Sequence, residues 1–226
     1  HDPVTVFDRE ADRVIADVLL DALPEVALLS EERAPHAADA ELTWVVDPLD
    51  GTNNFVRGLP DFAVSIGLVD ADGPRVACVF DPMREELFTA VRGEGARLND
   101  RPLHVSAQAS LDGASLGIGL SNETARRLTT LAKLPALAPH ARALRIVGSA
   151  ALDLAYVAAG RFDATWYLSL HAWDIAAGRL LVTEAGGRVT DLRGGPVRRP
   201  EADGVLATNG ALHAALLVAL PSSPAP

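Results

Sequence analysis

The spacing of apolar residues along the chain predicts alternating helices and strands. Apolar side chains recur at helical spacing over 11–23, and Pro24 ends the predicted helix. Three apolar runs, at 62–69, 75–80 and 86–91, are separated by Asp-Gly and Asp-Pro turns, so they predict an antiparallel meander. Further strands are predicted at 26–29, 44–46, 114–120, 144–147, 162–170, 187–192 and 204–208. Further helices are predicted at 121–134, 150–160, 173–185 and from Gly210 onward.

This order of elements predicts a layered α/β fold. Because helices and strands alternate in blocks, a sandwich of sheets and helices would bury their apolar faces. The stretch 135–140 contains two prolines and predicts a loop between two halves of the chain. We expect an N-terminal α+β half over 1–110 and a smaller α/β half over 111–226. The Pro/Ser-rich segment after Leu220 is expected to be disordered.

Composition and charge narrow the classes of function. The chain has 226 residues, of which 49% are hydrophobic and 22% charged, as in an ordinary soluble enzyme. No apolar run approaches the roughly 18 residues that a membrane span needs, so no membrane partner is expected. A net charge of −10 argues against nucleic-acid binding, and an anionic substrate would need bound cations to invert the local charge. The single cysteine, Cys78, fits a core position and a reducing, cytoplasmic location.

The segment 44–55, WVVDPLDGTNNF, carries the clearest candidate chemistry. A buried strand would deliver Asp47 at its end, and Pro48 would hold Asp47 in extended geometry. Asp50 follows within one turn, with the Leu49 carbonyl between the two carboxylates. Two carboxylates so placed can share or flank metal ions.

The same segment also predicts a phosphate-binding helix start. Gly51 and Thr52 would present backbone N–H groups, and helix N-termini favour anions. Asp-Pro and Asp-Gly are also frequent turn elements, so a plain acidic turn is the alternative interpretation of this segment.

Four motifs together resemble those of the inositol monophosphatase family. They occur in the family's order, cover nearly the whole chain and are highly specific in combination. The motifs are Val4–Asp8, Ser30–Glu32, Asp47–Phe55, and Trp173–Gly178 followed by Glu184–Gly187. The resemblance implies an αβαβα sandwich, a homodimer, lithium sensitivity and Mg²⁺-dependent hydrolysis of a small phosphate monoester.

The resemblance also implies roles for single residues. One magnesium would be held by Glu31, Asp47 and the Leu49 carbonyl, and a second by Asp47, Asp50 and Asp174. Magnesium prefers oxygen ligands, which suits this set. Thr52 and Asp8, assisted by Glu31, would orient and deprotonate the attacking water. The turn Gly148-Ser149-Ala150 would line the substrate together with Asp50.

Several of these residues have a plain structural alternative. Asp174 stands at the start of a predicted helix, where Asp is a common N-cap. The pair Glu31-Glu32 could be a solvated acidic pair, and Asp8 a surface residue that opens the helix over 11–23. His171 and Trp173 could simply pack under the helix that carries Asp174.

The chain departs from the family pattern at one substrate position. Relatives that act on inositol phosphate often have a glutamate four residues before the position of His171, and here that residue is Tyr167. A phenol can donate a hydrogen bond but offers no carboxylate to a sugar ring. Inositol phosphate is the first expectation. Histidinol phosphate, fructose 1,6-bisphosphate and nucleotide 3′-phosphates remain alternatives, as does a non-catalytic regulatory protein that retains the fold.

Overall fold

The computed structural model describes residues 4–36 and 40–220. The tail predicted to be disordered lies outside these residues. The helices are α1 Val6–Ala22, α2 Thr52–Val56, α3 Thr124–Leu137, α4 Ala150–Ala158, α5 Ala172–Glu184, α6 Pro200–Asp203 and α7 His213–Ala219. The strands are β1 Ala27–Ser30, β2 Arg33–His36, β3 Thr43–Asp50, β4 Ala63–Asp70, β5 Gly73–Asp81, β6 Glu86–Val91, β7 Gly95–Leu98, β8 Arg101–Pro102, β9 Ser115–Ile118, β10 Ala143–Arg145, β11 Ala164–Tyr167, β12 Arg188–Thr190 and β13 Val205–Thr208.

The first sheet grows from the predicted meander. Its strand order is β2-β1-β3-β4-β5-β6-β7-β8, and β1 and β3 pair in parallel whereas the other neighbours are antiparallel. Along β5 and β6, buried side chains alternate with more exposed ones, because successive side chains point to opposite faces. The three predicted strands of the meander are confirmed as β4, β5 and β6, while β2, β7 and β8 were not predicted.

The second sheet has the order β10-β9-β11-β13-β12. Its first three strands are parallel, and α3 and α4 make the crossovers that parallel pairing requires. Trp166 and Leu116 lie fully buried in the cluster that this sheet forms with the α3 and α7 side.

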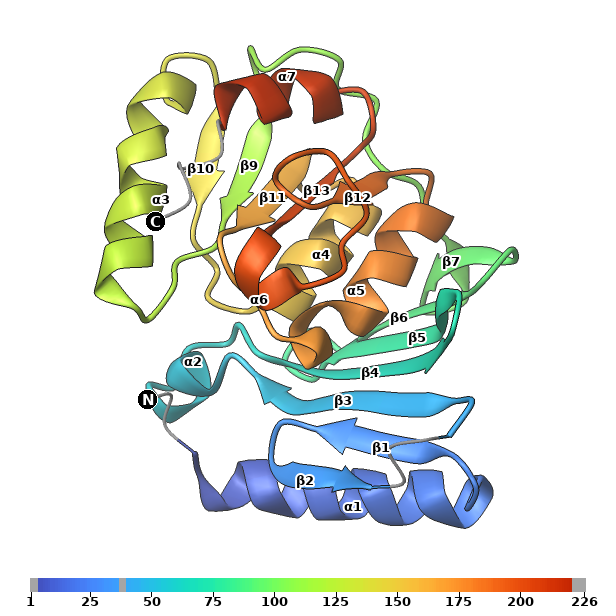
Figure 1. The fold of residues 1–226 in the computed structure, drawn as a ribbon. Helices are drawn as coiled ribbons and strands as arrows, with labels where there is room; N and C mark the ends of the chain where they lie inside the picture. The colour runs from blue at the N-terminus through green and yellow to red at the C-terminus, as the bar shows by residue number, and fades with distance from the viewer. Residues whose placement is uncertain (1–3, 37–39, 221–226) are drawn as a thin grey trace.

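The two sheets and the helices form five layers (Figure 1). The helix α1 covers the outer face of the first sheet, α4 and α5 lie between the sheets, and α3 and α7 cover the second sheet. Every residue of α4 is buried, because this helix has apolar neighbours on all sides. The helices α4 and α5 approach closely, since a Cβ at Gly178 would lie only 2.5 Å from Leu154 Cβ.

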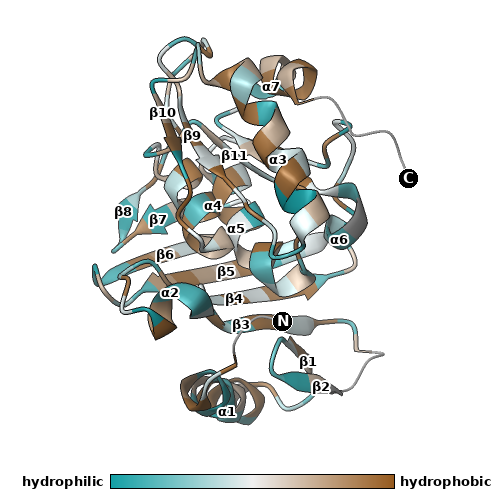
Figure 2. Ribbon diagram, turned by 90° about the vertical axis from the view of Figure 1, so that its left-hand side faces the viewer, coloured by the Kyte–Doolittle hydropathy of each residue, from teal (hydrophilic) through white to brown (hydrophobic). Residues whose placement is uncertain are grey.

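This arrangement confirms the layered α/β fold. The division into halves at 1–110 and 111–226 stays a prediction, and α4 and α5 pack against both sheets. None of the described helices is both long and apolar enough to cross a membrane. Figure 2 shows that α1 carries both apolar and polar residues, and some of its apolar side chains, including Val6 and Val18, are exposed.

Two predicted helix limits are wrong. The first helix begins at Val6, because Thr5 and Asp8 form a capping box that supports an earlier start. The predicted loop over 135–140 begins inside α3, which continues through Pro135 to Leu137. Leu137 is buried, and its packing under the second sheet offsets the hydrogen bond that the proline cannot make.

Candidate active site

The carboxyl end of β3 places two carboxylates on one side of the strand. In a regular strand, residues three apart point to opposite faces. The pairing of β3 with β4 shifts between Asp47 and Asp50, and this irregularity turns both side chains the same way. The Leu49 N–H donates to Asp47 Oδ1 at 3.0 Å and fixes the turn between them.

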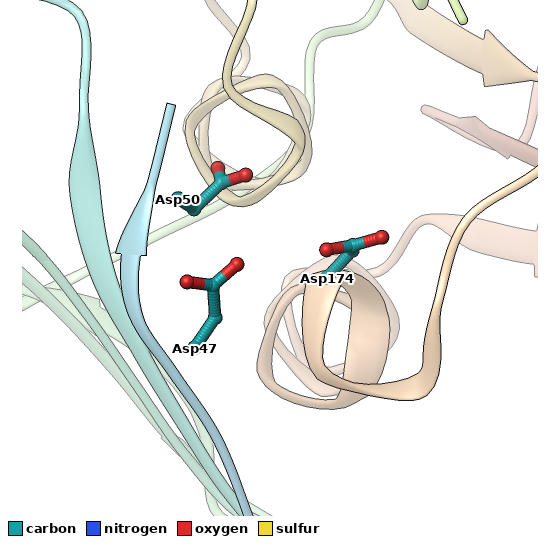
Figure 3. Close-up of side chains that lie close together, drawn as sticks. All are labelled: Asp47, Asp50 and Asp174. Carbon is teal, nitrogen blue, oxygen red and sulfur yellow. The ribbon is translucent and has the colours of Figure 1, made fainter. Parts of the chain in front are cut away.

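A third carboxylate arrives from a distant part of the chain. Asp174 lies in the first turn of α5 and accepts a hydrogen bond from the His171 N–H at 2.6 Å. One oxygen each from Asp47, Asp50 and Asp174 lies within 4.8 Å of the others. Figure 3 shows the three carboxyl groups converging from β3 and α5.

Burial makes Asp47 and Asp50 costly to ionise, and for Asp47 the neighbouring negative charges add to this cost. Burial raises the pKa of Asp47 well above its usual range, and the charges of Asp50, Glu31 and Asp174 raise it further. Burial likewise raises the pKa of Asp50, although hydrogen bonds from Ser149 and Ala151 partly lower it again. Among the described residues, neither Asp47 nor Asp50 forms an ion pair with an arginine or lysine. A bound cation would supply the missing charge.

The donor set fits a hard divalent cation. The cluster offers carboxylate oxygens, without histidine nitrogen or cysteine sulfur among the described groups that meet there. Oxygen-only donors suit Mg²⁺ or Ca²⁺ rather than zinc or copper. Glu31 follows β1 and lines the same cavity, outside the three-residue cluster. Its position is fixed by its N–H, which donates to the Val46 carbonyl at 3.2 Å.

A hydroxyl–carboxylate pair, the half-buried Thr52 and the buried Asp8, lies beside the cluster. Thr52 Oγ1 lies 3.1 Å from Asp8 Oδ1 and 3.0 Å from the Leu49 carbonyl, so these two acceptors share its single proton. Asp8 is buried at the third position of α1, where it also accepts from the Thr5 N–H at 2.7 Å. The interpretation of Asp8 as a surface residue is therefore wrong.

One cavity of about 680 Å³ joins these groups. The predicted residues that line it are Glu31, Asp47, Leu49, Asp50, Gly51, Thr52, Gly148, Ala150, Tyr167 and Asp174. Gly51 adopts a left-handed φ of 94° before α2, where a Cβ would meet the Asp61 carbonyl oxygen at 2.9 Å. Asp8 and Ser149 lie behind the wall. Their contacts with the lining are through Thr52 and Asp50 respectively.

The predicted substrate turn is coupled to the carboxylate cluster. Ser149 caps α4, and its hydroxyl donates to Asp50 Oδ2. The same carboxylate oxygen accepts from the Ala151 N–H at 2.7 Å. Asp50 therefore joins the end of β3 to the start of α4, and the cavity crosses the boundary between the two sheets. The catalytic, metal-binding and substrate-binding roles of these residues stay predictions.

A match to a family model identifies the family of the chain. The model of the inositol monophosphatase family matches residues 1–225. The chain belongs to the inositol monophosphatase family.

Curated relatives and solved structures of the family are similar over most of the chain. The Nus factor SuhB of Escherichia coli K12 is 46% identical over 197 residues, which cover 86% of this chain and 74% of that protein. A crystal structure of the extragenic suppressor protein SuhB from Bartonella henselae superposes with a TM-score of 0.92 at 40% identity, covering 97% of this chain and 85% of the other. The inositol monophosphatase from Anabaena (Nostoc) sp. PCC 7120 gives 0.89 at 38% identity, covering 94% and 85%.

In this member of the inositol monophosphatase family, the hydroxyl of Tyr167 has a partner inside the protein. It donates to Asp153 Oδ2 at 2.5 Å, and burial raises the pKa of Asp153 to about 7. The ring lies against Gly119, where a Cβ would be only 2.0 Å from Tyr167 Cδ1. Tyr167 therefore lines the cavity with its ring, while its hydroxyl is engaged by Asp153.

Sequence reasoning missed several residues of the site. Asp153 could have been found, because it is the one acidic residue in the otherwise apolar stretch 150–158. Asp153 does not line the cavity but contacts Tyr167, which does. The missed residues that line the cavity include Asn54, Ser121, Asn122, Arg126, Arg127 and Ser169. Asn54 lies inside the motif at 44–55, whereas no local pattern singles out the others, because their segments reach the cavity only through the fold.

Glu184 belongs to a family motif but lies away from the cluster. Its two carboxylate oxygens accept from the Gly93 and Gly95 N–H groups, each at 2.9 Å. It therefore ties the end of α5 to the β6–β7 hairpin.

Proposed function

We propose that this chain hydrolyses a small phosphate monoester in a Mg²⁺-dependent reaction, with inositol monophosphate as the first substrate to test. The observation that carries the proposal is the convergence of Asp47, Asp50 and Asp174 at one end of the cavity. Three close carboxylates, of which Asp47 and Asp50 have raised pKa values, have no stabilising purpose of their own, because their repulsion costs folding free energy.

The residues of the chain divide the work of the proposed reaction. Asp47, Asp50 and Asp174, with Glu31 and the Leu49 carbonyl, would hold the metal ions. When bound, Mg²⁺ would neutralise phosphoryl oxygens and lower the pKa of water in the site.

Thr52 would orient the attacking water. Its hydroxyl oxygen can accept a hydrogen bond from that water, and it already contacts Asp8. Asp8 would take the proton through Thr52, as a general base must lie within hydrogen-bond reach of the relay. Gly51 and Thr52, at the start of α2, would contact the phosphate, and Gly148 and Ala150 would line the rest of the ester.

A phosphate-release assay tests this proposal. Purified protein is incubated with inositol 1-phosphate, histidinol phosphate and fructose 1,6-bisphosphate, with millimolar Mg²⁺ or with EDTA. We expect release of phosphate from at least one ester with Mg²⁺ and none with EDTA. Release at equal rates in both conditions, or from no ester at all, would contradict the proposal.

A second candidate is a regulatory role without catalysis. It is favoured by the name Nus factor that the SuhB relatives carry. The same assay separates the two, because a protein that acts only as a regulator releases no phosphate under any condition. A homodimer, lithium inhibition and a cytoplasmic location stay predictions from the family. Light scattering checks the first, and a lithium titration of the phosphatase assay checks the second.

A further inference from the structure

The cavity is lined by side chains of both charges, which come from different elements. The carboxylate cluster and Glu31 come from β1, β3 and α5 in one part of the wall. Two cationic side chains, Arg126 and Arg127, enter the wall from the first turn of α3, next to Ser121 and Asn122. The chain as a whole has a net charge of −10, so a pair of arginines in this cavity stands out against the rest of the molecule.

The two arginines differ in how their charges are compensated. Arg126 Nε forms an ion pair with Glu123 Oε2 at 2.9 Å. Arg127 Nε and Nη2 instead donate to the carbonyl oxygens of Ser121 and Asn122, at 3.0 and 2.8 Å. Among the described residues, no carboxylate pairs with Arg127. Its guanidinium is therefore held in place by neutral backbone acceptors, and no described carboxylate compensates its charge.

The backbone contacts of Arg127 also orient the guanidinium. Both acceptors belong to the segment after β9 that itself lines the cavity. A planar guanidinium has five N–H donors, and the contacts with Ser121 and Asn122 use only two of them. The remaining donors suit a bidentate contact with a phosphate or carboxylate.

The size of the cavity leaves room for a ligand that reaches both sides. Pockets of about 300–1,000 Å³ hold drug-sized ligands, and this cavity measures about 680 Å³. A phosphate placed over Asp47, Asp50 and Asp174 would use one part of it. The walls formed by Gly119, Leu120 and Ser121 continue from Tyr167 to Arg127.

We infer that Arg127 binds a second anionic group of the substrate, so that the preferred substrates are phosphate monoesters with a further phosphate or carboxylate. This inference rests on the proposed function, because it places the reacting phosphate at the carboxylate cluster. Arg127 is then the specificity-determining residue. Arg126, whose charge Glu123 compensates, contributes less.

Matched substrates measure the contribution of the second anion. Fructose 1,6-bisphosphate is compared with fructose 1-phosphate, and 3-phosphoglycerate with glycerol 3-phosphate. Each pair differs in the second anionic group, and the two pairs distinguish a phosphate from a carboxylate. The readout is the ratio of kcat/KM within each pair, measured with Mg²⁺.

Three variants separate the role of Arg127 from general effects. Arg127→Ala removes the guanidinium, and Arg127→Lys keeps the charge but loses the bidentate geometry. Arg101→Ala is the matched control, because Arg101 is exposed on β8 and does not line the cavity. Melting temperatures report any loss of folding in each variant.

We expect wild-type protein to prefer at least one substrate that carries a second anionic group by about tenfold or more, since charge-assisted contacts are worth that much. In Arg127→Ala the ratio should fall to near one, mainly through a higher KM for the substrate with the second anionic group. Arg127→Lys should retain part of the preference, and Arg101→Ala should retain all of it. A ratio near one in wild-type protein, or an unchanged ratio in Arg127→Ala, would overturn the inference.

Failure of this inference can be distinguished from failure of the proposed function. If no ester is hydrolysed, the proposed function fails. The inference is then decided by calorimetric binding of fructose 1,6-bisphosphate and fructose 1-phosphate in the presence of Mg²⁺. Binding of the bisphosphate that is no tighter, or that Arg127→Ala leaves unchanged, would overturn it.

Discussion

At the scale of single residues, Asp174 makes a helix-capping contact and also belongs to the carboxylate cluster, which the sequence analysis treated as alternatives. It is the third residue of α5, and its carboxylate accepts from the N–H of His171, which is the N-cap. It also belongs to the carboxylate cluster with Asp47 and Asp50. The N-cap interpretation therefore named the wrong position, although a capping contact does exist.

Asp174→Asn separates these two contributions. Asparagine keeps the oxygen that caps the His171 N–H but loses the negative charge. We expect turnover to fall about a hundredfold or more, since one lost electrostatic element in a site of this kind costs roughly 3–4 kcal/mol. The metal-free melting temperature should change little. Asp174→Ala, which also loses the capping contact, should lower it further. A wild-type rate for Asp174→Asn would remove this residue from the metal assignment.

Asp153 predicts a pH dependence of folding. Burial raises its pKa from an ordinary 3.8 to about 7, so the folded state keeps a proton that the unfolded chain has lost. Its contribution to stability is therefore present below about pH 4 and is lost as the pH rises to about 7. Asp47 and Asp50 act in the same direction without metal, because their pKa values are raised too.

Asp153→Asn isolates this contribution, because asparagine does not titrate. The difference in unfolding free energy between the variant and wild type should therefore be about 2–3 kcal/mol larger at pH 8 than at pH 5, in favour of the variant. Urea unfolding in EDTA at the two pH values measures this difference. The same offset from wild type at both pH values would show that Asp153 is already ionised in the folded state.

At the scale of elements, the contact between α5 and the β6–β7 hairpin depends on Glu184. The carboxylate accepts hydrogen bonds from two backbone N–H groups, those of Gly93 and Gly95 in the turn. Since Glu184 does not line the cavity, its place in a family motif is explained by the tie between a helix and a hairpin.

Glu184→Ala should therefore weaken the fold and spare the chemistry. Loss of two hydrogen bonds to a charged group should cost about 1–3 kcal/mol, measured as a lower urea midpoint. Glu94→Ala, a change at an exposed position in the same turn, is the control and should cost much less. The kcat of Glu184→Ala should stay within about twofold of wild type. A large loss of kcat with normal stability would assign Glu184 to the site.

At the scale of the whole molecule, the site carries a charge imbalance that a cation would relieve. Carboxylates from β3 and α5 meet at the cavity, and the chain carries a net charge of −10. Repulsion among these carboxylates therefore destabilises the metal-free protein at the cavity. Metal binding should stabilise the whole fold, since an ion that binds only the folded state shifts the unfolding equilibrium.

Magnesium should raise the melting temperature. At a concentration one hundred times the dissociation constant, the gain in unfolding free energy would be about 2.7 kcal/mol. Asp47→Asn should lose most of this gain and be at least as stable as wild type in EDTA, because it removes one repelling charge. Scanning calorimetry with and without Mg²⁺ measures both effects. Equal melting temperatures of the wild type in the two conditions would argue against a metal centre.

The sequence alone determined much of this protein. The periodicity of apolar residues predicted most helices and strands, because each pattern reflects which face of one element is buried. The segment 44–55 brought Asp47, Leu49, Asp50 and Thr52 together, since neighbours in a strand and its turn stay neighbours in space. Four short motifs in order were enough to identify the family, which the family model confirms.

The tertiary structure decided what no local pattern contains. Only the packing of α5 between the sheets brings Asp174 to β3, and only the packing of α1 against β3 brings Asp8 to Thr52. The engagement of Tyr167 by Asp153 and the entry of Arg127 into the cavity likewise depend on elements distant in sequence. All these features have the same physical cause. A side chain's partners, burial and pKa follow from which elements pack together, whereas local sequence fixes only the direction in which each element presents it.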